Sequence, residues 1–363
     1  TVGGTTLIAN SIGENNKEKV LSYFSQNIIF GFILSIFISF IGLYYADFLF
    51  SIMGSTNNVI TLGTDYTDII FSGSIIFISL VALNSLLHAE GDTKTFRNVL
   101  ILSFFLNIVL NPLFIFGYSF IPAMGMKGIA IATILSQIIG FLILLNKIIK
   151  SSKLKGLKIK YFYPNIYILK NIFFQSAPIS VALFMIAIGN FIILVYISIY
   201  GEYAAAGFGS ATRFEQILLL PILGLNTAII SIIGQNFGAK QFSRVKESYK
   251  QAIFYGVILM IFSGMIIYFS ANKIVSIFSE DKSVIEFGSI YLKISAFIFP
   301  AYPIYFITNG FFMAIKKSNY SMYFNIIRNV FLPLPTILLA NFIGASFNSF
   351  FWCYGFFNWV FAL

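Results

Sequence analysis

Few residues of this chain can do chemistry, and the clearest pair stands inside an apolar stretch. Arg213 and Glu215 lie in "ATRFEQILLLP", among apolar and small side chains. Burying an ionised side chain at the centre of a bilayer costs at least about 2.5–3.5 kcal/mol, so a charge that persists there is a candidate for binding an ion or a substrate. On a helix the two side chains point about 200° apart and need different partners. The alternative is a helix that begins late and leaves both residues in water.

Uncharged polar residues inside other apolar stretches form a second group of candidates. They can line a wet cavity, or they can simply bond across helices. They are Asn84, Asn190, Asn309 and Tyr302.

Other chemistry has few residues to use. The single Cys353 excludes an intramolecular disulfide, a cysteine metal cluster and a two-cysteine redox pair. His88 is the only histidine, and the carboxylates are scattered. An enzyme needs a clustered nucleophile, base or metal site, so we expect no enzymatic activity and no cofactor.

Composition predicts an all-α polytopic membrane protein. Hydrophobic residues make up 58% of the chain, charged residues only 10%, and the mean hydropathy is +0.88. A helix of about 20 apolar residues spans a hydrocarbon core about 30 Å thick. The stretches that can do so are Ile28–Tyr45, Ile69–Leu87, Val99–Phe116, Ile129–Leu145, Ile179–Tyr200, Ile217–Ile233, Ala252–Phe269 and Ile294–Ala314.

The chain repeats itself at an offset of 225 residues. "LIANSIGENNKEKV" (Leu7–Val20) aligns with "IIGQNFGAKQFSRV" (Ile232–Val245), so that Gly13 meets Gly238. Further along, Tyr66 meets Tyr291 and Asn84 meets Asn309 without a gap. Chance similarity between two apolar regions is the alternative, but the glycines and turns coincide as well. We therefore predict two pseudo-symmetric halves, a plan common among transporters.

The offset also predicts where the halves divide. Counterparts of the residues before Ile232 would extend about sixty residues ahead of residue 1, and the last helix, beginning near Ala345, would stop before its partner Gly128–Lys150 does. We expect an N-terminally truncated twelve-helix protein with two six-helix bundles. Its expected parts are an N-terminal bundle at 1–150, a basic linker at 151–170 and a C-terminal bundle at 171–363.

Basic residues predict the orientation. Seventeen of the 23 Lys and Arg residues fall in one alternate set of connections, and seven of these lie between Lys147 and Lys170. Such an excess marks the cytoplasmic side. The net charge of +10 then reflects topology and attraction to anionic lipid headgroups, and no nucleic-acid partner is needed to explain it.

Glycines and prolines mark the expected turns and kinks. Gly13, Gly238 and Gly91 end apolar helices, where a positive φ is often required, and Asp92 or Thr93 can cap the helix that follows. Prolines in the second half should kink its helices, and we expect the segment with Pro300 and Pro303 to be the most distorted. These turns are structural or part of a gating hinge. The prolines are Pro178, Pro221, Pro300, Pro303, Pro333 and Pro335.

Four motifs follow one another along the chain: "TLIANSIGENNKEKV", "LLHAEGDTKTFRNVLILSFFLNIVLNPLFIFG", "PAMGMKGIAIATILSQIIGFLI" and "ATRFEQILLLPILGLNTAIISIIGQNFGAKQFSRV". In order and spacing they resemble the multidrug and toxic compound extrusion (MATE) family of transporters. The resemblance implies two six-helix bundles around a central cavity that opens alternately to either side. It further implies export of cationic or amphiphilic compounds in exchange for Na⁺ or H⁺ across the bacterial inner membrane, by a monomer.

The resemblance also suggests a role for Glu215 and leaves the coupling ion open. The acid of the family's R-x-E motif is associated with cation binding, and Glu215 occupies that place. Some sodium-linked members carry an aspartate midway along the tenth helix, where "FIFPAYPIYFITNG" has Tyr302 instead. A lipid or lipid-linked oligosaccharide flippase of the same superfamily is the alternative, with Arg213 and Arg328 as candidates to hold its pyrophosphate.

Overall fold

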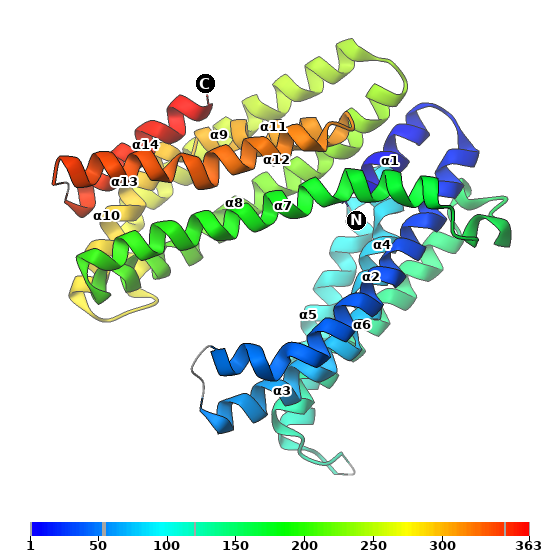
Figure 1. Ribbon diagram of the computed structural model, residues 1–363, viewed down its shortest axis with the longest axis horizontal. Coiled ribbons are helices and arrows are strands. Elements are labelled where there is room, and N and C mark those ends of the chain that lie inside the picture. The colour runs from blue at the N-terminus through cyan, green and yellow to red at the C-terminus, as the bar shows by residue number, and fades with distance from the viewer. Residues whose placement is uncertain (1, 53–55, 120, 345, 363) are drawn as a thin grey trace. The chain divides into compact units, whose positions relative to one another are not determined.

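The computed structural model describes residues 2–52, 56–119, 121–344 and 346–362, which are almost entirely helical and divide into two units (Figure 1). Thr1–Phe173 holds α1 (Val2–Gly13), α2 (Lys17–Ile52), α3 (Asn57–Ser72), α4 (Ser74–Glu90), α5 (Thr93–Phe116), α6 (Gly125–Ile149), η1 (Ser152–Leu154) and η2 (Ile159–Phe162). Helix α7 (Ile166–Ile197) crosses into the second unit, Phe174–Leu363. There follow η3 (Ser198–Tyr200), α8 (Glu202–Gly238), α9 (Phe242–Ser276), α10 (Lys282–Ile298), α11 (Ala301–Ala314), α12 (Ser318–Ile326), η4 (Ile327–Phe331), α13 (Pro333–Phe342) and α14 (Phe347–Ala362).

A lipid environment favours helices, because the backbone N–H and C=O groups find no water there and must form hydrogen bonds within the chain. Within the described ranges, seven helical segments are long and apolar enough to cross a membrane, and nine are if each of two bent pairs counts as one span. Large apolar side chains remain outside the bundles, among them Phe269 (84% exposed) and Phe342 (89%). The expectation of a polytopic all-α membrane protein is confirmed.

The two units repeat the same helical framework. Helices α9, α10 and α12 begin at Phe242, Lys282 and Ser318, each 225 residues after the start of α2, α3 and α5. Helix α2 packs on α3 and α4 as α9 packs on α10 and α11, and α6 contacts α3, α4 and α5 as α14 contacts α10, α11 and α13. The predicted duplication is thus visible in the bounds and the neighbours of the helices. Helix α14 begins at Phe347, and Ala345, near which it was expected to begin, lies outside the described residues.

Both units carry a bent span at the same repeat position. Helices α3 and α4 meet at 45° around Gly73, and α10 and α11 meet at 59° around Phe299 and Pro300. The larger bend lies where prolines predicted the greatest distortion. Helices α7 and α8 continue past Pro178 and Pro221, so these two prolines bend or distort a helix without ending it.

The helix-ending turns correct one prediction. Gly13 and Gly238 are the last helical residues, and the positive φ falls two positions later, at Asn15 (53°) and Lys240 (58°). The prediction does hold at Gly91 (87°), whose repeat partner is Lys316 (61°). The turns close by a backbone hydrogen bond five residues back, as in a Schellman motif, and this bond, rather than glycine, dictates the left-handed residue. Asp92 caps α5 as expected, accepting from the Thr95 N–H at 3.0 Å.

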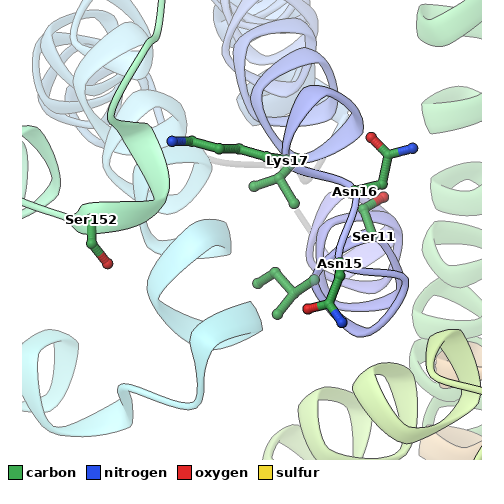
Figure 2. Close-up of a pocket in the computed structure, with 7 residues that line it drawn as sticks. Ser11, Asn15, Asn16, Lys17 and Ser152 are labelled. Carbon is green, nitrogen blue, oxygen red and sulfur yellow. The ribbon is translucent and has the colours of Figure 1, made fainter.

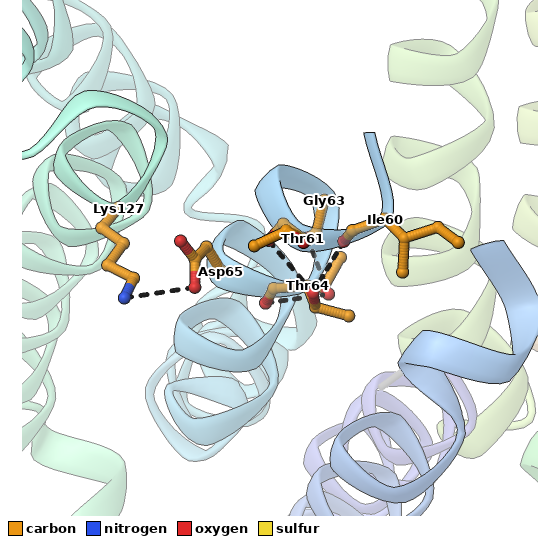
Figure 3. Close-up of polar contacts among 7 residues, drawn as sticks. Ile60, Thr61, Gly63, Thr64, Asp65 and Lys127 are labelled. Carbon is orange, nitrogen blue, oxygen red and sulfur yellow. Dashed lines mark hydrogen bonds and ion pairs between the residues drawn. The ribbon is translucent and has the colours of Figure 1, made fainter. Parts of the chain in front are cut away.

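Polar contacts fasten parts of the first unit together. Gln26 on α2 donates to the carbonyls of Tyr161 and Tyr163, both at 2.8 Å, and accepts from the Asn165 N–H at 2.9 Å, which holds the basic segment against α2. Figure 3 shows Lys127 of α6 paired with Asp65 of α3 at 3.1 Å. Asp65 lies near the middle of α3, and both side chains are partly exposed, so the pair contributes at most about 1 kcal/mol.

Gly91 and Lys316 occupy equivalent positions of the repeat with positive φ, and substitutions there should change the stability in opposite directions. Lys316→Gly should raise the free energy of unfolding by about 0.5–1 kcal/mol, because glycine alone adopts positive φ without strain, and Gly91→Ala should lower it by about 1 kcal/mol. Unfolding in mixed micelles, followed by circular dichroism, measures both changes. Lys317→Gly is the control, since Lys317 has φ −111°. An equal gain from Lys317→Gly would contradict the argument.

Candidate binding site

The buried Glu215 of α8 receives two phenolic hydrogen bonds. Its side chain is 5% exposed. Tyr291 donates to Oε2 at 2.5 Å and Tyr302 donates to Oε1 at 2.6 Å. Tyr291 lies on α10 and Tyr302 on α11, so the 59° bend between these helices brings two hydroxyls to one carboxylate.

The magnitudes explain how this charge can be held. An ionised acid at the bilayer centre costs about 2.5–3.5 kcal/mol, whereas a hydrogen bond to a charged group contributes about 1.5–3 kcal/mol. Two such bonds therefore offset the cost. The alternative of a water-exposed Glu215 at a late helix start is wrong, because α8 begins at Glu202.

Arg328 provides a positive charge on the other side of Tyr302. Its guanidinium carbon lies 5.1 Å from the centre of the Tyr302 ring and 3.8 Å from that of Tyr305. Its Nε–H donates to Oδ1 of Asn358 at 3.3 Å. Cation–π contacts contribute about 2 kcal/mol or more when desolvated. Tyr302 thus directs its hydroxyl at the carboxylate and its ring face at the guanidinium, and Glu215 and Arg328 form no ion pair within 4.0 Å.

A cavity of about 500 Å³ opens beside these groups, within the second unit. This volume falls in the range of small-molecule sites, about 300–1,000 Å³. Its lining combines two opposite charges, several amides and hydroxyls, and many aromatic rings. We call it the Glu215 cavity, and its lining is Ile186, Asn190, Phe191, Ile193, Leu194, Phe208, Gly209, Thr212, Glu215, Gln216, Leu219, Tyr291, Tyr302, Phe306, Arg328, Asn329, Phe351 and Tyr354.

A buried polar network supports one wall of the cavity. Tyr305 donates to Asn325, whose Nδ2 donates to Asn309 Oδ1 at 2.7 Å. Ser321 donates to the same oxygen at 2.7 Å, and Asn329 reaches the Tyr305 hydroxyl at 3.3 Å. Because Tyr305 is held at its hydroxyl, its ring stays beneath Arg328.

The structure separates the residues singled out from the sequence. Glu215, Tyr302 and Asn190 line the Glu215 cavity, whereas Asn309 belongs to the buried network. Arg213 is exposed, as expected for a residue about 200° from Glu215. Asn84 lies in the first unit, where its amide contacts His88 Nε2 at 3.1 Å.

Sequence reasoning missed Tyr291 as a partner of Glu215 and did not connect Arg328 with it. The repeat held a usable signal, because the second copy departs from the first at the cavity. At the 225-residue offset, Arg328 replaces Ser103 and Tyr302 replaces Phe77. A polar residue that replaces an apolar or small one in a duplicated fold is a candidate for the copy's own function.

A second, smaller cavity of about 250 Å³ lies at the turn between α1 and α2. Figure 2 shows Ser11, Asn15, Asn16 and Lys17 around this turn, with Ser152 contributed by η1. Lys17 is its one charged lining residue, and no aromatic side chain lines it. The Glu215 cavity is therefore the better candidate for a binding site.

Comparison with known proteins identifies the family. The MatE family matches residues 1–113 and 178–339, which is most of the chain. The chain belongs to the MatE family. It is therefore a membrane transporter and no enzyme.

Several relatives align along most of the chain. A FAD transporter of Shewanella oneidensis is 26% identical over 346 residues, 94% of this chain and 75% of that protein. The multidrug export protein MepA of Staphylococcus aureus is 23% identical over 342 residues, 94% and 74%. The probable multidrug resistance protein NorM of Thermotoga maritima is 28% identical over 295 residues, 81% and 63%.

Solved structures share the fold. An outward-facing multidrug resistance MATE transporter of the MOP superfamily matches with a TM-score of 0.90 at 25% identity, over 99% of this chain and 80% of that one. A MOP superfamily transporter from Pyrococcus furiosus also matches with a TM-score of 0.90, at 24% identity, over 99% and 80%. The predicted MATE-like architecture is thereby confirmed.

Removing one phenolic hydroxyl tests the geometry around Glu215. Tyr302→Phe and Tyr291→Phe should each lower the free energy of unfolding by about 1–3 kcal/mol, because each leaves one buried carboxylate oxygen without a donor. Unfolding in mixed micelles measures the loss. Tyr203→Phe is the control, since Tyr203 is 47% exposed. If the free energy of unfolding falls no further than in the control, these hydroxyls do not stabilise the buried Glu215 carboxylate.

Proposed function

We propose that this transporter exports amphiphilic aromatic compounds by exchange with Na⁺ or H⁺, and that Glu215 takes up the coupling cation or the positive end of the substrate. The observation that carries the proposal is a buried carboxylate, held by two tyrosines, that lines a cavity rich in aromatic rings. Relatives named as multidrug export or multidrug resistance proteins support the substrate class. Another relative is named as a FAD transporter, which supports a substrate with aromatic rings.

One carboxylate can couple two cations because either one neutralises it. A proton or Na⁺ on Glu215 removes the charge that would attract a cationic substrate, and a bound substrate cation removes the charge that would attract the ion. Occupancy by one therefore disfavours the other, and this reciprocal negative coupling lets the entry of one cation favour the release of the other. The hydroxyls of Tyr291 and Tyr302 also respond, since a protonated acid donates one hydrogen bond of its own and needs an acceptor in return.

Aromatic walls suit planar substrates. Phe208 packs edge-on against Tyr291, with centroids 4.9 Å apart, and Tyr291 packs likewise against Phe351 at 4.7 Å. These packed rings give a rigid surface on which a planar compound can stack, and their faces attract cations.

We further propose alternating access across the inner membrane of a bacterium, with the basic segment between Lys147 and Lys170 on the cytoplasmic side. Support comes from the excess of Lys and Arg in one set of connections. On this orientation Asn15, Gly91, Lys240 and Lys316, which all adopt positive φ, lie at the cytoplasmic ends of their helices.

Substitution of Glu215 tests the function. In proteoliposomes that contain the full-length protein, an imposed Na⁺ or H⁺ gradient should drive ethidium transport. We expect Glu215→Gln to lower this gradient-driven rate about tenfold or more, because the neutral amide attracts no cation. Comparison of separate Na⁺ and H⁺ gradients identifies the coupling ion.

Glu202→Gln is the matched control, because Glu202 is an exposed acid on the same helix. Its transport should equal that of the unmodified protein. Unchanged rate and ion dependence in Glu215→Gln would remove Glu215 from the mechanism.

A further inference from the structure

We infer that Arg328 binds an anionic group on the substrate, so that the Glu215 cavity accepts aromatic compounds bearing a carboxylate or a similar acidic group. This inference rests on the proposed export function and deepens it, because it names the residue that recognises an acidic group of the substrate. The geometry for it lies in the different surroundings of the two charges that line the cavity.

Glu215 and Arg328, the two charged residues that line the cavity, differ in their hydrogen-bond and ion-pair partners. Both oxygens of Glu215 accept short hydrogen bonds from tyrosines. In the described part of the chain, no Asp or Glu lies within 4.0 Å of Arg328. Of its five N–H donors, Nε–H contacts an amide oxygen at 3.3 Å. An incoming anion therefore gains a counter-charge at Arg328, whereas a cation at Glu215 competes with hydroxyls already in place.

Glu215 and Arg328 also form no direct ion pair, because Tyr302 contacts both of them. Tyr302 binds Glu215 by its hydroxyl and carries Arg328 over its ring. Tyr305 lies against Arg328 as well, and its hydroxyl is tied to the network of Asn325 and Asn329. The guanidinium is thus held by rings at the cavity wall, where a planar two-oxygen partner can meet its N–H groups.

The backbone at Arg328 differs from an ordinary helix. Arg328 lies in η4, a π-helical turn closed by the Leu332 N–H donating to the Ile327 carbonyl at 2.8 Å, directly before Pro333. Such turns occur frequently at functional sites, because the inserted residue redirects the side chains beside it. The equivalent part of the first unit lies inside the continuous helix α5, with Ser103 in place of Arg328. The charge and the irregular turn therefore occur together in the second unit.

Neighbouring residues complete a site for an acidic aromatic compound. Asn190 and Asn329 line the cavity with Arg328 and add amide donors, while Phe208, Phe351 and Tyr354 contribute rings. An acid on a planar ring system can thus place its oxygens on Arg328 and its rings against the aromatic lining.

A matched pair of dyes tests the inference. Rhodamine 6G is a cationic ester, and its free carboxylic acid keeps the same xanthene rings but adds one negative charge. Initial rates of uptake into proteoliposomes, measured over a range of dye concentrations, give KM and kcat for each. We expect Arg328→Gln to raise KM for the acid about tenfold or more while KM for the ester changes less than about twofold. Arg328→Lys, which keeps the charge but loses the planar fork, should give an intermediate KM for the acid.

Arg244→Gln is the control, since Arg244 is exposed on α9, outside the lining of the Glu215 cavity. Equal effects of Arg328→Gln on both dyes would show that Arg328 only supports the fold of the site, and would overturn the inference. Transport of the ester but not of the acid by the unmodified protein would overturn it too, yet would leave the export function standing. Transport of neither dye, nor of ethidium, would overturn the export function itself.

Discussion

The second unit depends on keeping a carboxylate and a guanidinium apart inside a membrane. Tyr302 achieves this with its two ends, since its hydroxyl binds Glu215 at 2.6 Å and its ring lies 5.1 Å from the Arg328 guanidinium. In a medium without water, each charge needs a partner. A direct ion pair would cancel both and leave nothing for a ligand. Bridging by a phenol stabilises both charges and keeps them available beside the cavity.

This arrangement requires irregular backbone at two places. The 59° bend between α10 and α11 brings Tyr291 and Tyr302 to the same carboxylate, and the π-helical turn η4 places Arg328 beside Tyr302. Broken helices at membrane depth are tolerated where protein or a cavity satisfies the freed backbone groups. The same irregularities that cost helical hydrogen bonds therefore build the site, and prolines lie at both of them.

Duplication supplied the framework, and divergence made a site of it. Both units share helix bounds, packing partners, a bent span and left-handed turns at the same offset. At the cavity the copies share one residue, Tyr66 and Tyr291, and differ at others, since Tyr302 aligns with Phe77 and Arg328 aligns with Ser103. Helical architecture tolerates such exchanges because lipid and backbone hydrogen bonding, rather than these side chains, maintain the helices.

The sequence by itself determined the membrane helices, the duplication, the place of the strongest bend and Glu215 as an acid inside an apolar stretch, because long apolar runs, a fixed offset, prolines and an isolated charge each act locally or by simple repetition. The sequence analysis placed the left-handed residues at Gly13 and Gly238, two positions too early, because the hydrogen bond that closes each turn decides which residue adopts positive φ. Only the tertiary structure decided that Tyr291, Tyr302 and Arg328 meet Glu215, and that Asn309 supports the wall instead of lining the cavity. These residues lie as far as 113 positions from Glu215 in the chain. Their meeting depends on the bend angle and on the extra residue in the π-helical turn, which no local pattern of side chains encodes.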